Sequence, residues 1–244
     1  MLGKYDPANI LKKRYKLKGW KAEAADWGVG FAEAAVFYFI LLPLLLGAYP
    51  PAVVVQTCSM AGVYNVGDVA VMGGTTFDGL QAPALTTSSL DYTIVPNNVS
   101  ERTQKLVFSD GQELAIQQWG DIVLYNSGTS GEQIIHRAIA KVTTPSGRYI
   151  LTKGDANNVP DSVRLECAEW VETTQGTMCK AIRSDVSRIC TSSDVGWPGC
   201  LGTPVPEKAV LGKALFSIPL VGHVKMLFMH IITLGHGYPG TLWC

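Results

Sequence analysis

Residues 29–48 read VGFAEAAVFYFILLPLLLGA, an apolar run of 20 residues whose single charge is Glu33. About 20 apolar residues in a helix span the hydrocarbon core of a bilayer. The apolar core of a cleavable signal peptide is shorter, about 7–15 residues, so the run predicts a retained transmembrane anchor over residues 29–49. Pro50-Pro51 then ends the helix, because proline lacks the backbone donor and clashes with the preceding turn. The alternative, a buried core helix, fits the length and the flanks less well.

A basic segment lies directly before this run. The chain as a whole has a net charge of zero, but Met1–Lys21 holds seven basic residues against one acidic residue, a net charge of +6. A basic block can bind nucleic acid, but one that directly precedes an apolar run is typical of the cytoplasmic flank of a membrane helix. We therefore expect residues 1–28 to be a cytoplasmic basic segment with no nucleic-acid partner. Everything after Tyr49 is then outside the cytoplasm.

Residues 50–220 have the pattern of a mainly β domain. Short runs rich in Val, Ile and Tyr alternate with Gly, Pro and Ser turns, and no amphipathic helix of ordinary length is visible between residues 57 and 208. Two polar segments interrupt the pattern: residues 73–113 are expected to be a long surface excursion, and residues 162–206 an insertion that carries cysteines. The expected strands are Ala52–Gln56, Gly67–Met72, Ile122–Tyr125, Ile134–Val142, Tyr149–Thr152 and Val210–Phe216.

Four of the six cysteines lie in the second insertion. A location outside the cytoplasm permits disulfides. Cys167 with Cys179 and Cys190 with Cys200 would staple two hairpins, but four cysteines allow three pairings, and free thiols are the other alternative. No CxxC spacing is present, so we expect no zinc site.

The C-terminal segment is apolar again from Ala209 to Leu234, but lysines and histidines interrupt it. A charge at the bilayer centre costs at least about 2.5–3.5 kcal/mol. We therefore predict that residues 221–244 contain a helix, beginning at about Val221, that lies at the membrane interface. A second membrane span is the alternative.

The stretch that follows the anchor, TCSM, contains Ser59. A serine hydroxyl is a poor nucleophile until a base takes its proton, and the only histidine inside the β domain is His136, in the run IIHRAIAKV. An imidazole base needs a carboxylate on its other nitrogen, and the turn sequence LTKGDANNVPD supplies Asp155 and Asp161. On pattern alone, a lone histidine in an apolar strand is more often a core residue. Acidic residues beside Gly, Asn and Pro more often form a plain turn.

The order of these motifs is more specific than any one of them. It resembles type I signal peptidases of the archaeal and ER-type branch, whose usual pattern is Ser-x-Ser-Met-x-Pro with Gly-Asp eight and nine positions after the nucleophile. The resemblance covers roughly residues 29–161, and more faintly residues 210–219. Two departures are Gly62, where proline is usual, and Ala156, where asparagine is common. The matching motifs are Thr57-x-Ser59-Met60, Gly67-Asp68, Gly120-Asp121-Ile122-Val123, His136-Arg137, and Lys153-Gly154-Asp155 followed by Asp161.

The resemblance implies a role for each matching position. Ser59 corresponds to the nucleophile, His136 to the general base, and Asp161 to the acid that orients the imidazole. Asp155 corresponds to a second functionally important acid. The oxyanion hole would consist of the Ser59 backbone N–H and the Thr57 hydroxyl. Cys58, if it is a thiol, is a rival nucleophile.

The resemblance also implies a function. It predicts a signal-peptidase-type β domain that removes signal peptides from exported preproteins at the outer surface of the cell membrane, or of the ER membrane, without a metal or cofactor. The implied partners are preprotein signal peptides and the lipid bilayer, together with other signal peptidase complex subunits or the translocon. One alternative is a Ser-Lys peptidase with Lys141 or Lys153 as the base. The other is a membrane-anchored, non-catalytic subunit or binding module.

Overall fold

The computed structural model describes residues 6–16, 18–96, 104–116, 119–128, 131–157, 160–173, 176–189 and 203–232. For residues 95–96, 104, 163–173, 176–189 and 229–232 it describes the backbone alone. The chain divides into two compact units, Met1–Gly47 and Ala48–Cys244.

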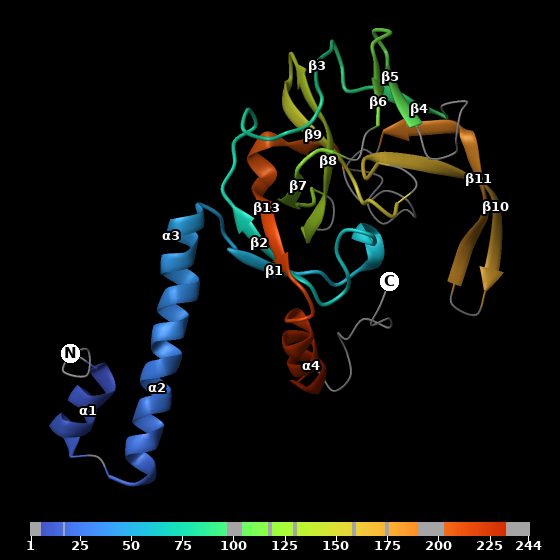
Figure 1. The fold of residues 1–244 in the computed structure, drawn as a ribbon. Helices are drawn as coiled ribbons and strands as arrows, with labels where there is room; N and C mark the ends of the chain where they lie inside the picture. Colours follow the sequence, from blue (N-terminus) through green and yellow to red (C-terminus); the bar gives the residue numbers. More distant parts are fainter. Residues whose placement is uncertain are drawn as a thin grey trace. The chain divides into compact units, whose positions relative to one another are not determined.

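The N-terminal unit is helical (Figure 1). Helix α1 (Pro7–Tyr15) begins at Asp6, whose Oδ1 accepts a hydrogen bond from the Ala8 N–H at 2.9 Å. Helix α2 (Trp20–Val36) continues through a π-helical turn (Phe37–Leu41) into α3 (Leu42–Leu46). The π-helical turn ends two residues before Pro43, which has no N–H to donate to the regular helical ladder.

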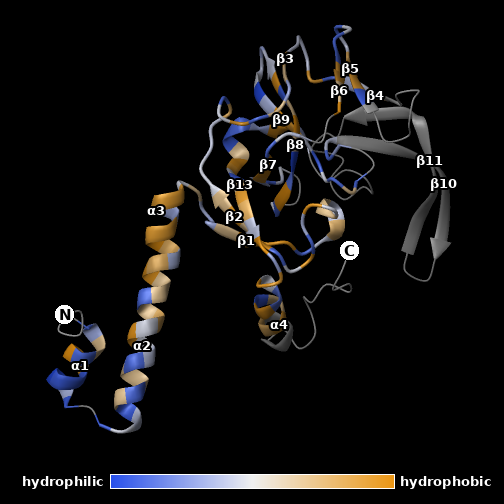
Figure 2. Cartoon of the chain, viewed as in Figure 1, coloured by the Kyte–Doolittle hydropathy of each residue, from blue (hydrophilic) through white to orange (hydrophobic). Residues whose placement is uncertain are grey.

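The continuous helix from Trp20 to Leu46 is long and apolar enough to cross a membrane. It begins before the predicted anchor at residue 29, because residues 20–28 (WKAEAADWG) include alanines and charged helix formers and no proline. The α3 end of the helix is the hydrophobic one (Figure 2). Large apolar side chains such as Phe31, Leu44 and Leu45 are exposed on it, as expected for a helix that contacts lipid.

The second unit is built mostly of β-strands (Figure 1). Its main sheet has eight strands in the order β1-β2-β13-β7-β8-β9-β12, with β3 paired to β8. All of these pairings are antiparallel except that of β3 with β8. The strands of the main sheet are β1 (Ala52–Val54), β2 (Val69–Gly73), β3 (Ala84–Thr86), β7 (Ile122–Asn126), β8 (Gln133–Thr144), β9 (Gly147–Lys153), β12 (Val205–Pro206) and β13 (Val210–Ile218).

Every strand expected from the sequence is present, with ends shifted by a few residues. The prediction for residues 73–113 was wrong. That segment contains β3 and a second sheet of β4 (Tyr92–Pro96), β5 (Gln104–Phe108) and β6 (Glu113–Ala115). Its buried side chains Tyr92, Leu106 and Phe108 form one core cluster with residues of β8 and β9. Its two apolar runs, YTIV at residues 92–95 and LVF at residues 106–108, are short and lie within a polar segment, so its average composition hides them.

The cysteine-bearing segment forms a long hairpin of β10 (Val163–Thr173) and β11 (Gly176–Ile189). Its end rejoins the main sheet, where β12 pairs with β9. Cys167 faces Ile182 across the hairpin and Cys179 faces Trp170, so the two cysteines are not direct cross-strand partners. The predicted pairings among Cys167, Cys179, Cys190 and Cys200 lie outside the described side chains.

Helix α4 (Gly222–Ile232) begins where the sequence predicts a C-terminal helix. It is joined to the turn after the Ser59 segment: the Gly222 N–H donates to the Gly67 carbonyl at 2.8 Å, and the Leu220 N–H donates to Asp68 Oδ1 at 3.2 Å. Gly67 has a φ of +87°, and the His223 ring occupies the space that a Cβ would need. The Gly67-Asp68 motif therefore serves as the docking point of α4.

Candidate active site

Ser59 lies in a short 3-10 turn, Cys58–Met60, which follows edge strand β1. Met60 is fully buried in the core cluster beneath β1 and β2, so it pins the turn to the sheet. Thr57, the residue before the turn, has an extended backbone and is exposed, and Ser59 is half-buried. The Ser59 hydroxyl is therefore held by a rigid element but can still be reached from solvent.

His136 and Asp161 come from different elements and meet at Ser59. His136 lies on β8 opposite Val123 of β7, and Asp161 begins the segment that leads into β10. His136 Nε2 is 2.8 Å from Ser59 Oγ, and His136 Nδ1 is 2.6 Å from Asp161 Oδ2. Both His136 and Asp161 are only 3% exposed. The structure thus joins the three residues in one hydrogen-bonded chain.

The hydrogen positions follow from this geometry. A carboxylate can only accept, so His136 donates its Nδ1–H to Asp161 and its Nε2 accepts the Ser59 hydroxyl hydrogen. Thr57 Oγ1 is 3.2 Å from Ser59 Oγ. Because the Ser59 hydrogen points to His136, Thr57 donates in this contact. The Thr57 hydroxyl is consequently a donor within reach of the atom that would attack a substrate.

Asp155 lies on the same loop as Asp161 but has a different partner. Arg137 Nε and Nη2 donate to the two oxygens of the Asp155 carboxylate at 2.8 and 2.7 Å, and Arg137 Nη1 donates to the Gly120 carbonyl at 2.7 Å. The hydrogen bonds with Asp155 raise the pKa of Arg137. This two-pronged ion pair holds the loop against β8.

The loop held by Asp155 also holds the backbone of Ser59. The Ala156 N–H donates to the Ser59 carbonyl at 2.9 Å. A Cβ at Gly154 would lie 2.6 Å from that carbonyl oxygen, so only glycine permits the close approach. Steric contact with the Ser59 backbone therefore explains why the Lys-Gly-Asp motif has glycine at position 154.

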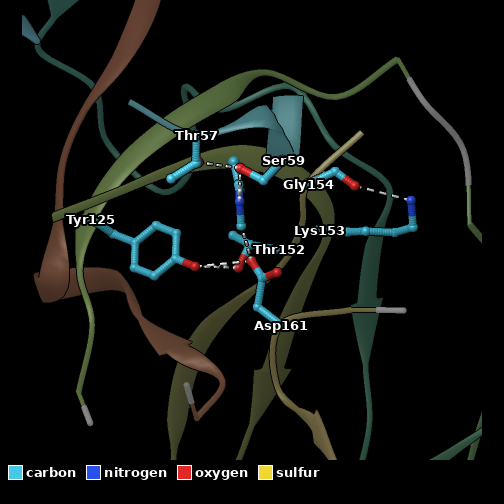
Figure 3. A network of polar contacts seen from close by, with 8 residues as sticks. Thr57, Ser59, Tyr125, Thr152, Lys153, Gly154 and Asp161 are labelled. Atoms are coloured by element: carbon cyan, nitrogen blue, oxygen red, sulfur yellow. Dashed lines mark hydrogen bonds and ion pairs between the residues drawn. The ribbon is translucent and has the colours of Figure 1, made fainter. Parts of the chain in front are cut away.

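Asp161 has a second neighbour that the sequence analysis missed. Tyr125 Oη donates to Asp161 Oδ2 at 2.9 Å, and Thr152 Oγ1 donates to Tyr125 Oη at 3.1 Å (Figure 3). Burial raises the pKa of Tyr125 well above its ordinary value, so its hydroxyl keeps its proton. A tyrosine in the run IVLY reads as core filling, and nothing in that pattern signals a contact with a residue 36 positions away.

The two lysines considered as alternative bases have other partners. Lys153 Nζ donates to the Gly154 carbonyl at 3.1 Å (Figure 3), and burial lowers its pKa. Lys141 Nζ lies 3.4 Å from the Asp78 carbonyl oxygen and 5.5 Å from the centre of the Phe77 ring. Within the described part of the chain, Ser59 Oγ contacts Thr57 and His136 and neither lysine.

Cys58 is not a free thiol. It is disulfide-bonded, and its partner is one of the cysteines whose side chains the structure does not describe. The rival-nucleophile reading of Cys58 was therefore wrong, because a disulfide sulfur has no thiolate to attack with. The disulfide instead ties the turn that carries Ser59 to another part of the chain.

Among the described residues, no group of three or more His, Cys, Asp or Glu side chains is arranged to hold a metal ion. No protein-family profile matches the sequence, and a search of curated proteins gave no match. The chemistry of this site is therefore argued from its own residues.

Proposed function

We propose that the protein is a membrane-bound serine endopeptidase that removes signal peptides from exported preproteins. The observation that carries the proposal is the chain of two short hydrogen bonds from Ser59 Oγ through His136 to the buried carboxylate of Asp161. This is the arrangement that a serine needs to become a nucleophile near neutral pH. The order of the sequence motifs, which resembles that of archaeal and ER-type signal peptidases, supplies the substrate class.

The reaction follows from the hydrogen-bond directions. His136 Nε2 takes the hydroxyl proton as Ser59 Oγ attacks the scissile carbonyl, and Asp161 stabilises the imidazolium that forms. The Ser59 N–H and the Thr57 hydroxyl would stabilise the oxyanion, a contribution of about 3–4 kcal/mol for each well-placed donor. The imidazolium then protonates the leaving amine. Water, deprotonated by His136, hydrolyses the acyl-serine and regenerates the hydroxyl.

The helix from Trp20 to Leu46 would be the membrane anchor. The net charge of +6 in Met1–Lys21 supports a cytoplasmic N-terminus with the β domain on the outer side of a cell or ER membrane. The disulfide at Cys58 supports the same orientation, because disulfides persist in oxidising compartments. The cut would then fall at the outer membrane–water interface.

An exposed apolar surface supports contact between the β domain and lipid. It is formed by the end of β13, the turn after it and the first half of α4. Only residues 47–51 connect α3 to β1, so an anchored helix would tether β1 close to the bilayer. We propose that this surface rests in the membrane interface. Its members are Leu215, Phe216, Ile218, Leu220, Val221, Val224, Leu227 and Phe228.

The test is cleavage of a radiolabelled preprotein by the purified full-length chain in detergent or vesicles. We expect a single cut after small residues at positions −1 and −3, located by sequencing the new N-terminus. A preprotein with a large residue at −1 is the substrate control, because a small pocket would exclude it. Ser59→Ala should abolish the cut, and Ser217→Ala, a serine on β13, should leave it unchanged.

The alternatives predict different results. If the chain is a non-catalytic subunit, Ser59→Ala leaves preprotein processing intact in cells that depend on the protein. If it is a Ser-Lys peptidase, His136→Ala retains activity and replacement of Lys141 or Lys153 removes it. Either result would overturn the assignment of His136 as the base.

A further inference from the structure

We propose that Tyr125 is a positioning residue for Asp161: its hydroxyl holds the carboxylate oxygen that orients His136. This inference rests on the proposed function for its kinetic consequences, but not for its geometric ones. Tyr125 acts through Asp161 and touches neither Ser59 nor a substrate. Neither the motifs of the sequence nor the resemblance gives it any role.

The contact begins with the register of the two strands. Val123 of β7 faces His136 of β8, and Tyr125 faces Ile134. Side chains two positions apart on a strand share a face, so Tyr125 lies on the face that carries His136, diagonally beside it. The sheet therefore fixes Tyr125 and His136 as neighbours before Asp161 is added.

Asp161 is bonded unevenly. Its Oδ2 accepts from both His136 Nδ1, at 2.6 Å, and Tyr125 Oη, at 2.9 Å. Its Oδ1 is buried and has no hydrogen-bond partner among the described residues. Among the described residues, this buried carboxylate therefore has two side-chain donors, of which Tyr125 is one.

The direction of the Tyr125 hydrogen bond is set by a third residue. Thr152 Oγ1 donates to Tyr125 Oη at 3.1 Å, which leaves the phenol hydrogen for Asp161. Tyr125 is 2% exposed, so water does not compete for this hydrogen. The run Thr152–Tyr125–Asp161–His136–Ser59 is thus one directed network (Figure 3).

Loss of the Tyr125 hydroxyl should move the pH dependence of the reaction in one direction. The active form has an ionised Asp161 and a neutral His136. In general, a hydrogen bond donated to a carboxylate favours its ionised form. Without the Tyr125 hydroxyl, we expect Asp161 or His136 to take up a proton at a higher pH than in the wild type. Protonation of either residue inactivates the site. The acid limb of the pH–rate profile should therefore move to higher pH.

Tyr125→Phe tests this with almost no change in side-chain volume. We expect kcat for preprotein cleavage to fall about tenfold, KM to change little, and the acid limb to move up. Thr152→Val, which removes only the donor to Tyr125, should give a smaller change in the same direction. Tyr92→Phe is the matched control, because Tyr92 is also a buried tyrosine but its hydroxyl bonds Ser162 Oγ at 2.7 Å and not the carboxylate.

A second measurement does not depend on activity. In the full chain labelled with ¹⁵N-histidine in detergent micelles, the His136 ring is assigned with His136→Gln and titrated by NMR. Tyr125→Phe should move its titration midpoint to higher pH, relative to both the wild type and Tyr92→Phe.

The outcomes separate the inference from the proposed function. If the wild type cleaves preproteins but Tyr125→Phe matches it in kcat and in the acid limb, the positioning role is wrong and the peptidase survives. The same shift in Tyr92→Phe would also overturn the role, because Tyr92 bonds the neighbouring Ser162 and not the Asp161 carboxylate. If the wild type does not cleave, the proposed function fails, and the NMR midpoints alone decide whether Tyr125 controls the Asp161–His136 pair.

Discussion

Asp155 and Asp161 lie on one loop and bond to adjacent residues of one strand: Asp155 to Arg137, and Asp161 to His136. Neighbouring side chains on a strand point to opposite faces, so the loop contacts β8 on both of its faces. The partner decides what each carboxylate can do. Arg137 is a permanent cation and makes a fixed two-pronged ion pair, whereas His136 can gain and lose a proton. We infer that Asp155 is mainly structural and Asp161 mainly chemical.

The largest effect that separates the two acids is expected on activity. Asp161→Asn leaves the shape of the side chain but favours the wrong imidazole tautomer, so kcat should fall about 10⁴-fold. Asp155→Asn should lower kcat far less. Preprotein cleavage rates, measured at temperatures where both variants are folded, check this order. Equal losses in the two variants would contradict the division of roles.

The Arg137–Asp155 ion pair should also contribute to the stability of the fold. Arg137 and Asp155 have side-chain exposures of 12% and 8%, and breaking a buried ion pair costs about 3 kcal/mol or more because one charge is left unpaired. Arg137→Met should therefore lower Tm clearly. The double variant Arg137→Met/Asp155→Leu should regain part of that loss, because no buried charge remains. Thermal unfolding followed by circular dichroism gives the comparison, and a double variant less stable than Arg137→Met would refute it.

Gly154→Ala tests whether the Asp155 loop positions Ser59. The added methyl would lie 2.6 Å from the Ser59 carbonyl oxygen, so the loop or the turn must shift. We expect kcat to fall about tenfold, since small displacements of a reacting group are costly. Gly28→Ala is the control, because a Cβ at that position of helix α2 would have no other atom within 4 Å. Wild-type kcat in Gly154→Ala would show that the loop does not set the position of Ser59.

The smallest effect is expected at Lys153, which lies beside the same loop. Burial lowers its pKa from the ordinary value of 10.5, so the folded state disfavours the charged form. The resulting destabilisation is present at neutral pH and disappears above the unfolded pKa, where the group is neutral in both states. Lys153→Met should therefore raise Tm slightly at pH 7 and leave cleavage intact. Loss of cleavage would favour the Ser-Lys alternative.

The strands and the central residues of the site were predictable because both have local signals. β-branched runs such as IVLY and IIHRAIAKV mark strands, and Ser59, His136 and Asp161 belong to short motifs at fixed spacing. The contacts of Tyr125 and Tyr92 were not predictable, because they depend on strand pairing and not on sequence neighbours. The disulfide at Cys58 was missed because the residue was considered only beside Ser59 and not as a partner for a distant cysteine.

For residues 73–113, the composition of the segment gave the wrong expectation. Their polar composition predicts surface, yet Tyr92, Leu106 and Phe108 are buried against β8 and β9. Few apolar residues are needed when a neighbouring sheet already supplies most of the core, so average polarity was a poor guide there.

The central claim is that Ser59, His136 and Asp161 act as one unit. The most direct test is the preprotein cleavage rate of Ser59→Ala, His136→Ala and the double variant, all in the full chain. Groups that act as a unit are not additive, so all three variants should share one residual rate, about 10⁴-fold or more below the wild type. A Ser59→Ala protein that still cleaves, or a double variant slower by the product of the two single losses, would contradict the account.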